Sequence, residues 1–175
     1  MKKPQFVNNQ IYHLYNRGVE KRKVFLDDGD HFRFIHDLSE FNDIEPALPS
    51  NIQFSLRRPS QFTSQCLEVE PLNIGKEGSK KPLIEILAFC LMPNHYHLLV
   101  RQLIDNGITR FMQKLGTGYT MYFNQKNKRV GSLFQGRFKA VPIENERHFL
   151  YIPYYIHLNP LGLIEPEWQE KKLKN

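Results

Sequence analysis

Residues 83–103, LIEILAFCLMPNHYHLLVRQL, decide the fold, because they predict two strands joined by a short turn. The first part, 83–92, is almost entirely apolar and lies between prolines, which is typical of a central strand buried on both faces. Pro93 and Asn94 favour a tight turn, so the chain from residue 95 onward returns as the second strand of a hairpin.

The segments on either side of the hairpin extend this pattern into an alternating order of strands and helices. Apolar residues spaced by two predict strands, and apolar residues spaced by three and four predict helices. In chain order we expect a strand at 10–17, a helix at about 30–42 capped by Asp30, the hairpin, a helix at 107–124, a strand at 133–143 and a helix from about Glu144 to Pro160. This is the order of an α+β, ferredoxin-like (RRM-like) βαββαβ sheet with an added C-terminal helix.

Length and composition predict one domain. The chain has 175 residues, of which 41% are hydrophobic, and we expect them to form a single domain over 1–175. Residues 46–82 lose the periodic pattern and hold five of the eleven prolines, so we expect a flexible insertion there. The sequence offers neither an apolar run that could span a bilayer nor a signal-peptide pattern, so we expect a cytoplasmic protein without a membrane partner.

Positive charge is concentrated in one part of the chain. The formal net charge is +6, and between residues 101 and 140 a single acid, Asp105, stands against eight basic residues: Arg101, Arg110, Lys114, Lys126, Lys128, Arg129, Arg137 and Lys139. Aromatic residues alternate with them, which suits a surface that follows phosphates and stacks bases, although a charge excess alone also fits a solvated face. Arg110 and Lys114, on the helix at 107–124, are among the candidate DNA contacts.

The hairpin carries two histidines on one face. Because side chains alternate along a strand, His95 and His97 point the same way, about 7 Å apart, with Tyr96 on the other face. Two imidazoles at this spacing can bind one metal ion. Taken alone, such a pair is more often hydrogen-bonded structure, so a third ligand is needed to make the case.

The last predicted helix offers that ligand and a reactive side chain. Tyr151, Tyr155 and Asn159 lie four residues apart and share one helical face. An amide oxygen can complete a site for a hard cation, and a phenol one turn away can attack a phosphate that the cation polarises. Singly, Tyr155 could equally anchor the helix and Asn159 could cap its end.

Three blocks of sequence, MPNHYHLL, LFQGRF and YIHLNP, resemble those of the HUH single-tyrosine transposases, and most closely the REP-associated tyrosine transposases. The resemblance extends from YHLYNRG, near residue 12, to about Ile164, interrupted by the insertion. It implies a metal-dependent single-stranded DNA endonuclease and transesterase that cleaves beside hairpins formed by REP-like sequences, through a covalent 5′-phosphotyrosine.

The resemblance also implies roles for particular residues. His95, His97 and Asn159 would hold Mg²⁺ or Mn²⁺, and Tyr155 would be the nucleophile. Basic positions in the matching blocks would contact phosphates, namely Arg17, Arg137 and Lys139. Relatives include monomers and homodimers, so the oligomeric state stays open.

Pro153 departs from this pattern. It lies two residues before Tyr155, inside the predicted helix, where it removes a backbone donor and should kink the helix or shift its start. Tyr151 and Tyr154 are therefore competing candidates for the nucleophile.

Two other classes of function fit part of the pattern. A non-catalytic RRM-like module could bind single strands with the same aromatic and basic residues. A metallohydrolase could use His95, His97 and a water, with no role for tyrosine. We favour the transposase, because a tyrosine and an amide one helical turn apart have no common role in either alternative.

Overall fold

The computed structural model describes residues 5–46 and 80–158. Within these ranges, four strands form one antiparallel sheet in the order β2-β3-β1-β4. The strands are β1 (Ile11–Arg17), β2 (Ile84–Met92), β3 (His95–Gln102) and β4 (Lys139–Pro142). This order confirms the predicted ferredoxin-like α+β fold. Asn159 and most of the predicted insertion, residues 47–79, lie outside the described residues.

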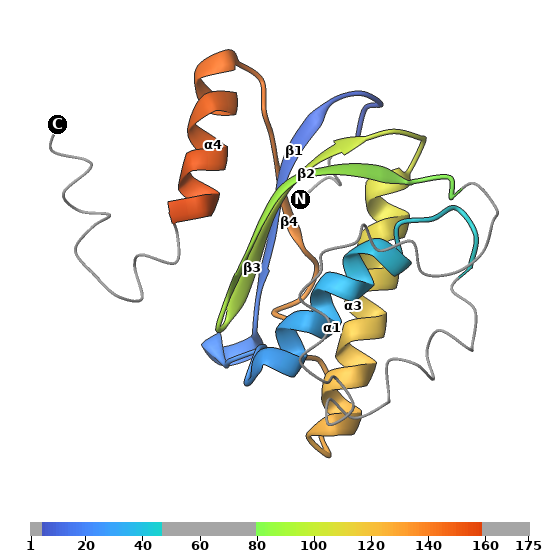
Figure 1. Cartoon of the computed structure of the whole chain (residues 1–175), viewed down its shortest axis with the longest axis vertical. Helices are drawn as coiled ribbons and strands as arrows, with labels where there is room; N and C mark the ends of the chain where they lie inside the picture. The colour runs from blue at the N-terminus through green and yellow to red at the C-terminus, as the bar shows by residue number, and fades with distance from the viewer. Residues whose placement is uncertain (1–4, 47–79, 159–175) are drawn as a thin grey trace, which may run out of the picture.

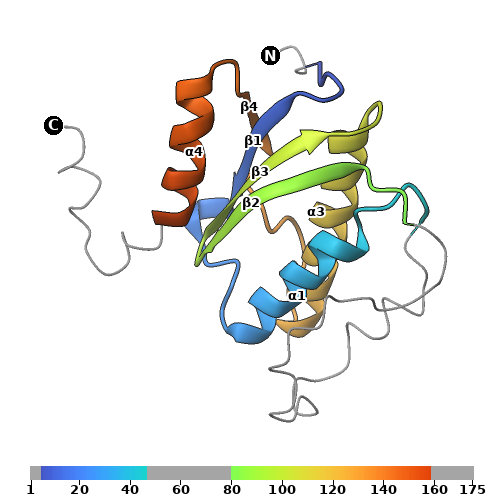
Figure 2. The same cartoon turned by 45° about the horizontal axis from the view of Figure 1, so that its top comes forward.

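The helices divide between the two faces of the sheet. Helices α1 (Asp28–Glu40) and α3 (Gly107–Lys126) pack together on one face, and α4 (Glu146–Leu158) lies on the opposite face (Figure 1). The rotated view shows α4 apart from the other two helices, beyond the strands (Figure 2). Every helix in the described part of the chain is too short or too polar to cross a membrane.

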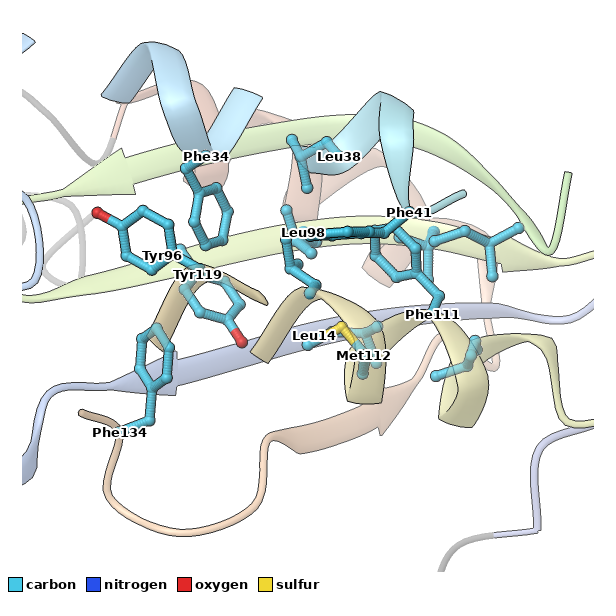
Figure 3. Packing of buried hydrophobic residues seen from close by; sticks show 14 of the residues in the cluster. Leu14, Phe34, Leu38, Phe41, Tyr96, Leu98, Phe111, Met112, Tyr119 and Phe134 are labelled. Atoms are coloured by element: carbon cyan, nitrogen blue, oxygen red, sulfur yellow. The ribbon is translucent and has the colours of Figure 1, made fainter. Parts of the chain in front are cut away.

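The main core fills the space between the sheet and the helices α1 and α3. Leu14, Tyr96 and Leu98 point from the strands toward Phe34 of α1 and Tyr119 of α3 (Figure 3). These side chains are almost completely buried, and their rings meet at edge-to-face and tilted angles. The Tyr119 hydroxyl donates a hydrogen bond of 2.6 Å to the carbonyl of Val24, so this large aromatic residue leaves no unpaired polar group in the core.

A second, smaller core lies on the other face of the sheet. Ala88 and Cys90 of β2 and Leu99 of β3 pack against Ile152 and Ile156 of α4. Ile156 is completely buried. This contact fixes α4 across β2 and across β3, the strand that carries the histidine pair.

The turn that precedes the histidine pair is held from outside the hairpin. Met92 pairs with His95 across it, leaving Pro93 and Asn94 as the turn residues. The Gly18 amide donates to the carbonyl of Asn94 at 2.8 Å, and the Val24 amide donates to the carbonyl of Pro93 at 2.7 Å. A side chain at position 18 would collide with the carbonyl oxygen of Arg22, so only glycine lets residues 18 and 22 come this close together.

Three sequence-based expectations need correction. The strand at 83–92 was expected in the centre of the sheet, but β2 is its edge strand; it is apolar because α3 contacts one of its faces and α4 packs on the other. The strand expected at 133–143 begins only at Lys139, because Gly136, with φ of 77°, interrupts extended geometry and Phe134 makes only an isolated bridge.

The third correction concerns the start of α1. Asp27, not Asp30, is the N-cap, and its side chain accepts a hydrogen bond from the Asp30 amide. The Asp30 carboxylate is buried and binds the Leu26 amide and the Lys126 ammonium. Lys126 lies on another helix, so local sequence could not reveal this ion pair.

Candidate active site

Strands β1 and β3 bring three histidines to the face of the sheet that α4 covers. Cross-strand pairs put Tyr15 opposite His97 and Arg17 opposite His95, and alternation puts His13 on the same face. The His95 and His97 rings lie 5.0 Å apart at 86° to each other. The sheet thus holds the predicted pair as neighbours and adds a third imidazole.

His95 is held by its neighbour in the turn. Its Nδ1 lies 2.6 Å from Oδ1 of Asn94, an atom that can only accept, so Nδ1 carries the proton and Nε2 has the lone pair. Burial lowers the pKa of His95, and the positive charge of Arg17 lowers it further. The ring is therefore neutral at physiological pH.

His97 is buried more deeply, with 6% of its surface exposed. Its Nδ1 lies 2.8 Å from Nε2 of His13. Burial, followed by the nearby His13 and His95, lowers the pKa of His97 to about 3. Its Nε2 is buried and has no hydrogen-bond partner among the described residues. A buried nitrogen without a hydrogen-bond partner destabilises the folded protein, so this atom is suited to bind a ligand.

The two imidazoles fit a divalent metal ion. Both rings are neutral, and both have Nδ1 engaged by another side chain, which leaves Nε2 as the nitrogen that could bind a metal. Within 5–46 and 80–158, no three His, Cys, Asp or Glu side chains are grouped to hold a metal by themselves. A third ligand of another type is therefore required, and the predicted one, Asn159, is the residue after the last one described.

Tyr155 of α4 lies beside the imidazoles in the same chain. Its ring centroid is 5.6 Å from that of His97, edge to face, and 6.5 Å from that of His13. Ile152 and Ile156 anchor the helix on either side of it. Pro153 lies within α4 without ending it, so the helix presents Tyr155 to the site as the spacing predicted.

The two competing tyrosines are placed differently. Tyr151 stacks on Tyr155 at 6.2 Å, one turn earlier, and 52% of its surface is exposed. Tyr154 is 66% exposed. Of the three, Tyr155 is the one whose ring contacts both His13 and His97.

The structure separates the predicted DNA-contacting residues into two groups. Arg17 lies beside His95, and Lys139 lies with its ammonium 5.9 Å from the Tyr15 ring, next to His97. Arg137 is exposed in the segment that leads into β4. Arg17 and Lys139 therefore lie on the histidine side of the sheet.

Arg110 and Lys114 lie on α3, across the sheet from the histidines. Their side chains donate hydrogen bonds to the carbonyls of residues 43–45, at 2.6 to 2.8 Å. The structure does not bring them to the site, and a DNA contact by either stays a prediction.

His13 is the residue that sequence reasoning missed. A single histidine in a strand carries no periodic signal, and its contact with His97 joins residues 84 positions apart. The only available signal was its place in a strand predicted to alternate, on the same face as Arg17.

Comparison with known proteins agrees with this fold. The solved structure of a REP-associated tyrosine transposase bound to a REP hairpin matches with a TM-score of 0.53 and 14% identity, covering 93% of this chain and 73% of that one. The chain therefore has the fold of this transposase. A candidate transposase from Deinococcus radiodurans R1 matches with a TM-score of 0.46 and 16% identity, covering 90% of this chain and 96% of that one.

Residues 52–159, more than half of the chain, match the family described as IS200-like transposases. The chain belongs to this family, which confirms the family resemblance and makes the protein a transposase, an enzyme that cuts and rejoins DNA. A search of curated protein sequences gave no significant match.

Proposed function

We propose that the protein cleaves and rejoins single-stranded DNA beside hairpins, with Tyr155 as nucleophile and a divalent metal ion held by His95 and His97. The observation that carries the proposal is the contact between the Tyr155 and His97 rings, 5.6 Å apart, at a histidine whose buried Nε2 has no partner among the described residues. A transposase needs a nucleophile next to a point that stabilises phosphate charge, and this cluster supplies both.

His95 and His97 would hold Mg²⁺ or Mn²⁺ through Nε2, with Asn159 as the proposed third ligand. When bound, such an ion polarises the non-bridging oxygens of the scissile phosphate and neutralises part of their charge. The chain's own contribution is to keep both rings neutral through burial and to fix their orientation through Asn94 and His13.

Tyr155 would carry the covalent step. Its phenol oxygen forms a bond to phosphorus and gives up its proton, while the bond from phosphorus to the 3′ oxygen breaks and that oxygen takes up a proton. The products are a 5′-phosphotyrosine and a free 3′-hydroxyl. Because the phosphodiester energy is retained in the adduct, the 3′-hydroxyl of a second strand can reverse the step and join the ends without ATP.

The proposed substrate is a single strand adjacent to a hairpin, as the solved relative bound to a REP hairpin suggests. Arg17 and Lys139 are suitable for the phosphates that flank the cut, because both lie on the histidine face and both side chains are exposed. Arg137 is a third proposed contact.

The test is adduct formation on a denaturing gel, with a labelled hairpin-bearing single strand and Mn²⁺. We expect a protein–DNA adduct with the wild type, no adduct in EDTA and none with Tyr155→Phe, which removes only the hydroxyl. Tyr154→Phe is the matched control, because it removes the same atom from the adjacent, exposed residue, and it should form the adduct at the wild-type rate.

An adduct that persists in Tyr155→Phe would overturn the assignment of the nucleophile. Cleavage without any adduct would instead support a hydrolase that uses water, and strand binding with neither cleavage nor EDTA sensitivity would support a binding module.

A further inference from the structure

His13 makes a contact that packing alone does not require. Its Nε2 lies 2.8 Å from Nδ1 of His97, and the two rings are stacked 5.0 Å apart at 21°. Both residues are buried, with 7% and 6% of their surfaces exposed. One proton lies between these two nitrogens, so one of them donates the hydrogen bond and the other accepts it.

The position of that proton decides which nitrogen of His97 is free. A neutral imidazole has one N–H and one lone pair. If His13 donated from Nε2, the lone pair of His97 would be on Nδ1, where it accepts this hydrogen bond. Nε2 of His97 would then be a buried N–H without an acceptor among the described residues. If His97 donates from Nδ1, its lone pair is on Nε2, the atom that faces the proposed metal.

We propose that His13 is a positioning residue that accepts the Nδ1 proton of His97 and so holds His97 in the tautomer that presents its Nε2 lone pair to the metal. This inference rests on the proposed function. It assigns His13 a place outside the metal's own ligands, since no three-residue group that includes it is arranged for metal binding among the described residues.

His95 is oriented in a similar way, by a hydrogen bond from its Nδ1 to another side chain. Its Nδ1 is held by Oδ1 of Asn94 at 2.6 Å, so each proposed ligand has its own acceptor. The acceptor for His95 comes from the adjacent turn, whereas the acceptor for His97 comes from β1, a strand that precedes the region matched to the family at residues 52–159. Strand β1 would therefore contribute directly to metal binding, through the orientation of a ligand.

Metal affinity of the full-length, metal-free protein gives a first test that does not depend on activity. By isothermal titration with Mn²⁺, His13→Phe, which keeps an aromatic ring but removes the acceptor, should weaken binding by about 10- to 100-fold, as is usual for the partner of a metal-bound histidine. His13→Gln, whose amide oxygen can accept the same proton, should recover most of that loss. His31→Phe, the same change in a histidine of α1 on the far side of the sheet, should leave the affinity unchanged.

Long-range ¹H–¹⁵N NMR on the wild type gives a second test that no folding defect can disturb. We expect the metal-free protein to show His97 protonated at Nδ1 and His13 without a proton at Nε2. The reverse assignment overturns the inference, as does Mn²⁺ affinity that is unchanged in His13→Phe.

His97→Ala distinguishes this failure from failure of the proposed function. If His97→Ala loses Mn²⁺ binding while His13→Phe keeps it, only the role of His13 is wrong. If His97→Ala also binds Mn²⁺ as tightly as the wild type, the proposed metal site itself is wrong.

Discussion

At the scale of single residues, the site depends on keeping imidazoles neutral in a protein that must bind a polyanion. Burial lowers the pKa of both His95 and His97, and Arg17 adds to the effect at His95. Arg17 can thus have two uses, because its charge disfavours a protonated His95 and is also available to a phosphate. The proposed metal ligand His95 and the proposed phosphate contact Arg17 are therefore compatible as neighbours.

The division of basic residues gives a prediction at this scale. Lys139→Ala should weaken single-strand DNA binding several-fold and reduce the slope of log affinity against log salt by about 0.7, the value for one phosphate contact on a single strand. Fluorescence anisotropy over a salt series, without metal so that cleavage does not interfere, measures both quantities.

Lys114→Ala is the control for that measurement, because Lys114 is tied to the carbonyls of Asp43 and Glu45 on the other side of the sheet. If DNA contacts only the histidine face, the salt slope of this variant should match the wild type. Equal losses in the two variants would mean that DNA also contacts the helical side of the molecule, as the charge distribution in the sequence first indicated.

At the scale of secondary-structure elements, α4 positions the Tyr155 side chain beside the histidines. Its contacts to the sheet come from Ile152 and Ile156, while Leu150 and Tyr154 are largely exposed. The position of Tyr155 therefore depends on a small apolar contact that is separate from the main core. A change in this contact should disturb the chemistry before it disturbs the rest of the fold.

Ile156→Ala tests this dependence. It removes a completely buried side chain, so we expect the free energy of unfolding to fall by about 2–4 kcal/mol and the rate of adduct formation to fall with it. Leu150→Ala, on the same helix but with 64% of its surface exposed, should change stability by less than about 0.5 kcal/mol and leave the adduct rate unchanged. Urea unfolding and the gel assay measure the two effects; a normal adduct rate in a destabilised Ile156→Ala would show that Tyr155 does not need the contact.

A second element-scale prediction concerns the joint between α1 and α3. The Lys126 ammonium contacts the Asp27 carboxylate at 2.8 Å, and this hydrogen bond lowers the pKa of Asp27. A carboxyl group with a lowered pKa stabilises the folded state above its ordinary range, near pH 4, and loses that contribution as the pH falls through its lower folded value.

Asp27→Asn should therefore be less stable than the wild type at pH 7, by at most about 1 kcal/mol because the pair is largely exposed, and this difference should shrink as the pH falls through the lowered folded pKa of Asp27. The amide still caps α1, so the helix start is preserved. Asp28→Asn is the control, since it removes the same charge from the first turn of α1 and leaves the carboxylates that bind Lys126. A difference from the wild type that does not shrink on acidification would contradict the assignment.

At the scale of the whole molecule, the sequence predicts what depends on local pattern and misses what depends on partners far along the chain. The order of elements, the common face of His95 and His97 and the helix of Tyr155 follow from periodicity. The edge position of β2, the true cap of α1 and the contact between His13 and His97 follow from the pairing of distant segments. Asn159 is outside the described residues, so its role stays a prediction.

The two faces of the sheet have different tasks in this arrangement. The face under α1 and α3 carries the main aromatic core, and the opposite face carries the histidines, Tyr155 and the exposed ends of Arg17 and Lys139. The main core and the candidate site therefore lie on opposite faces of one sheet.

Peptide mapping of the trapped adduct tests the central claim most directly. After reaction with a hairpin-bearing single strand and Mn²⁺, nuclease trimming and proteolysis, mass spectrometry should find a nucleotide linked through its 5′ phosphate to Tyr155. A nucleotide on Tyr151, Tyr154 or any other side chain, or cleaved DNA with no modified peptide, would contradict it.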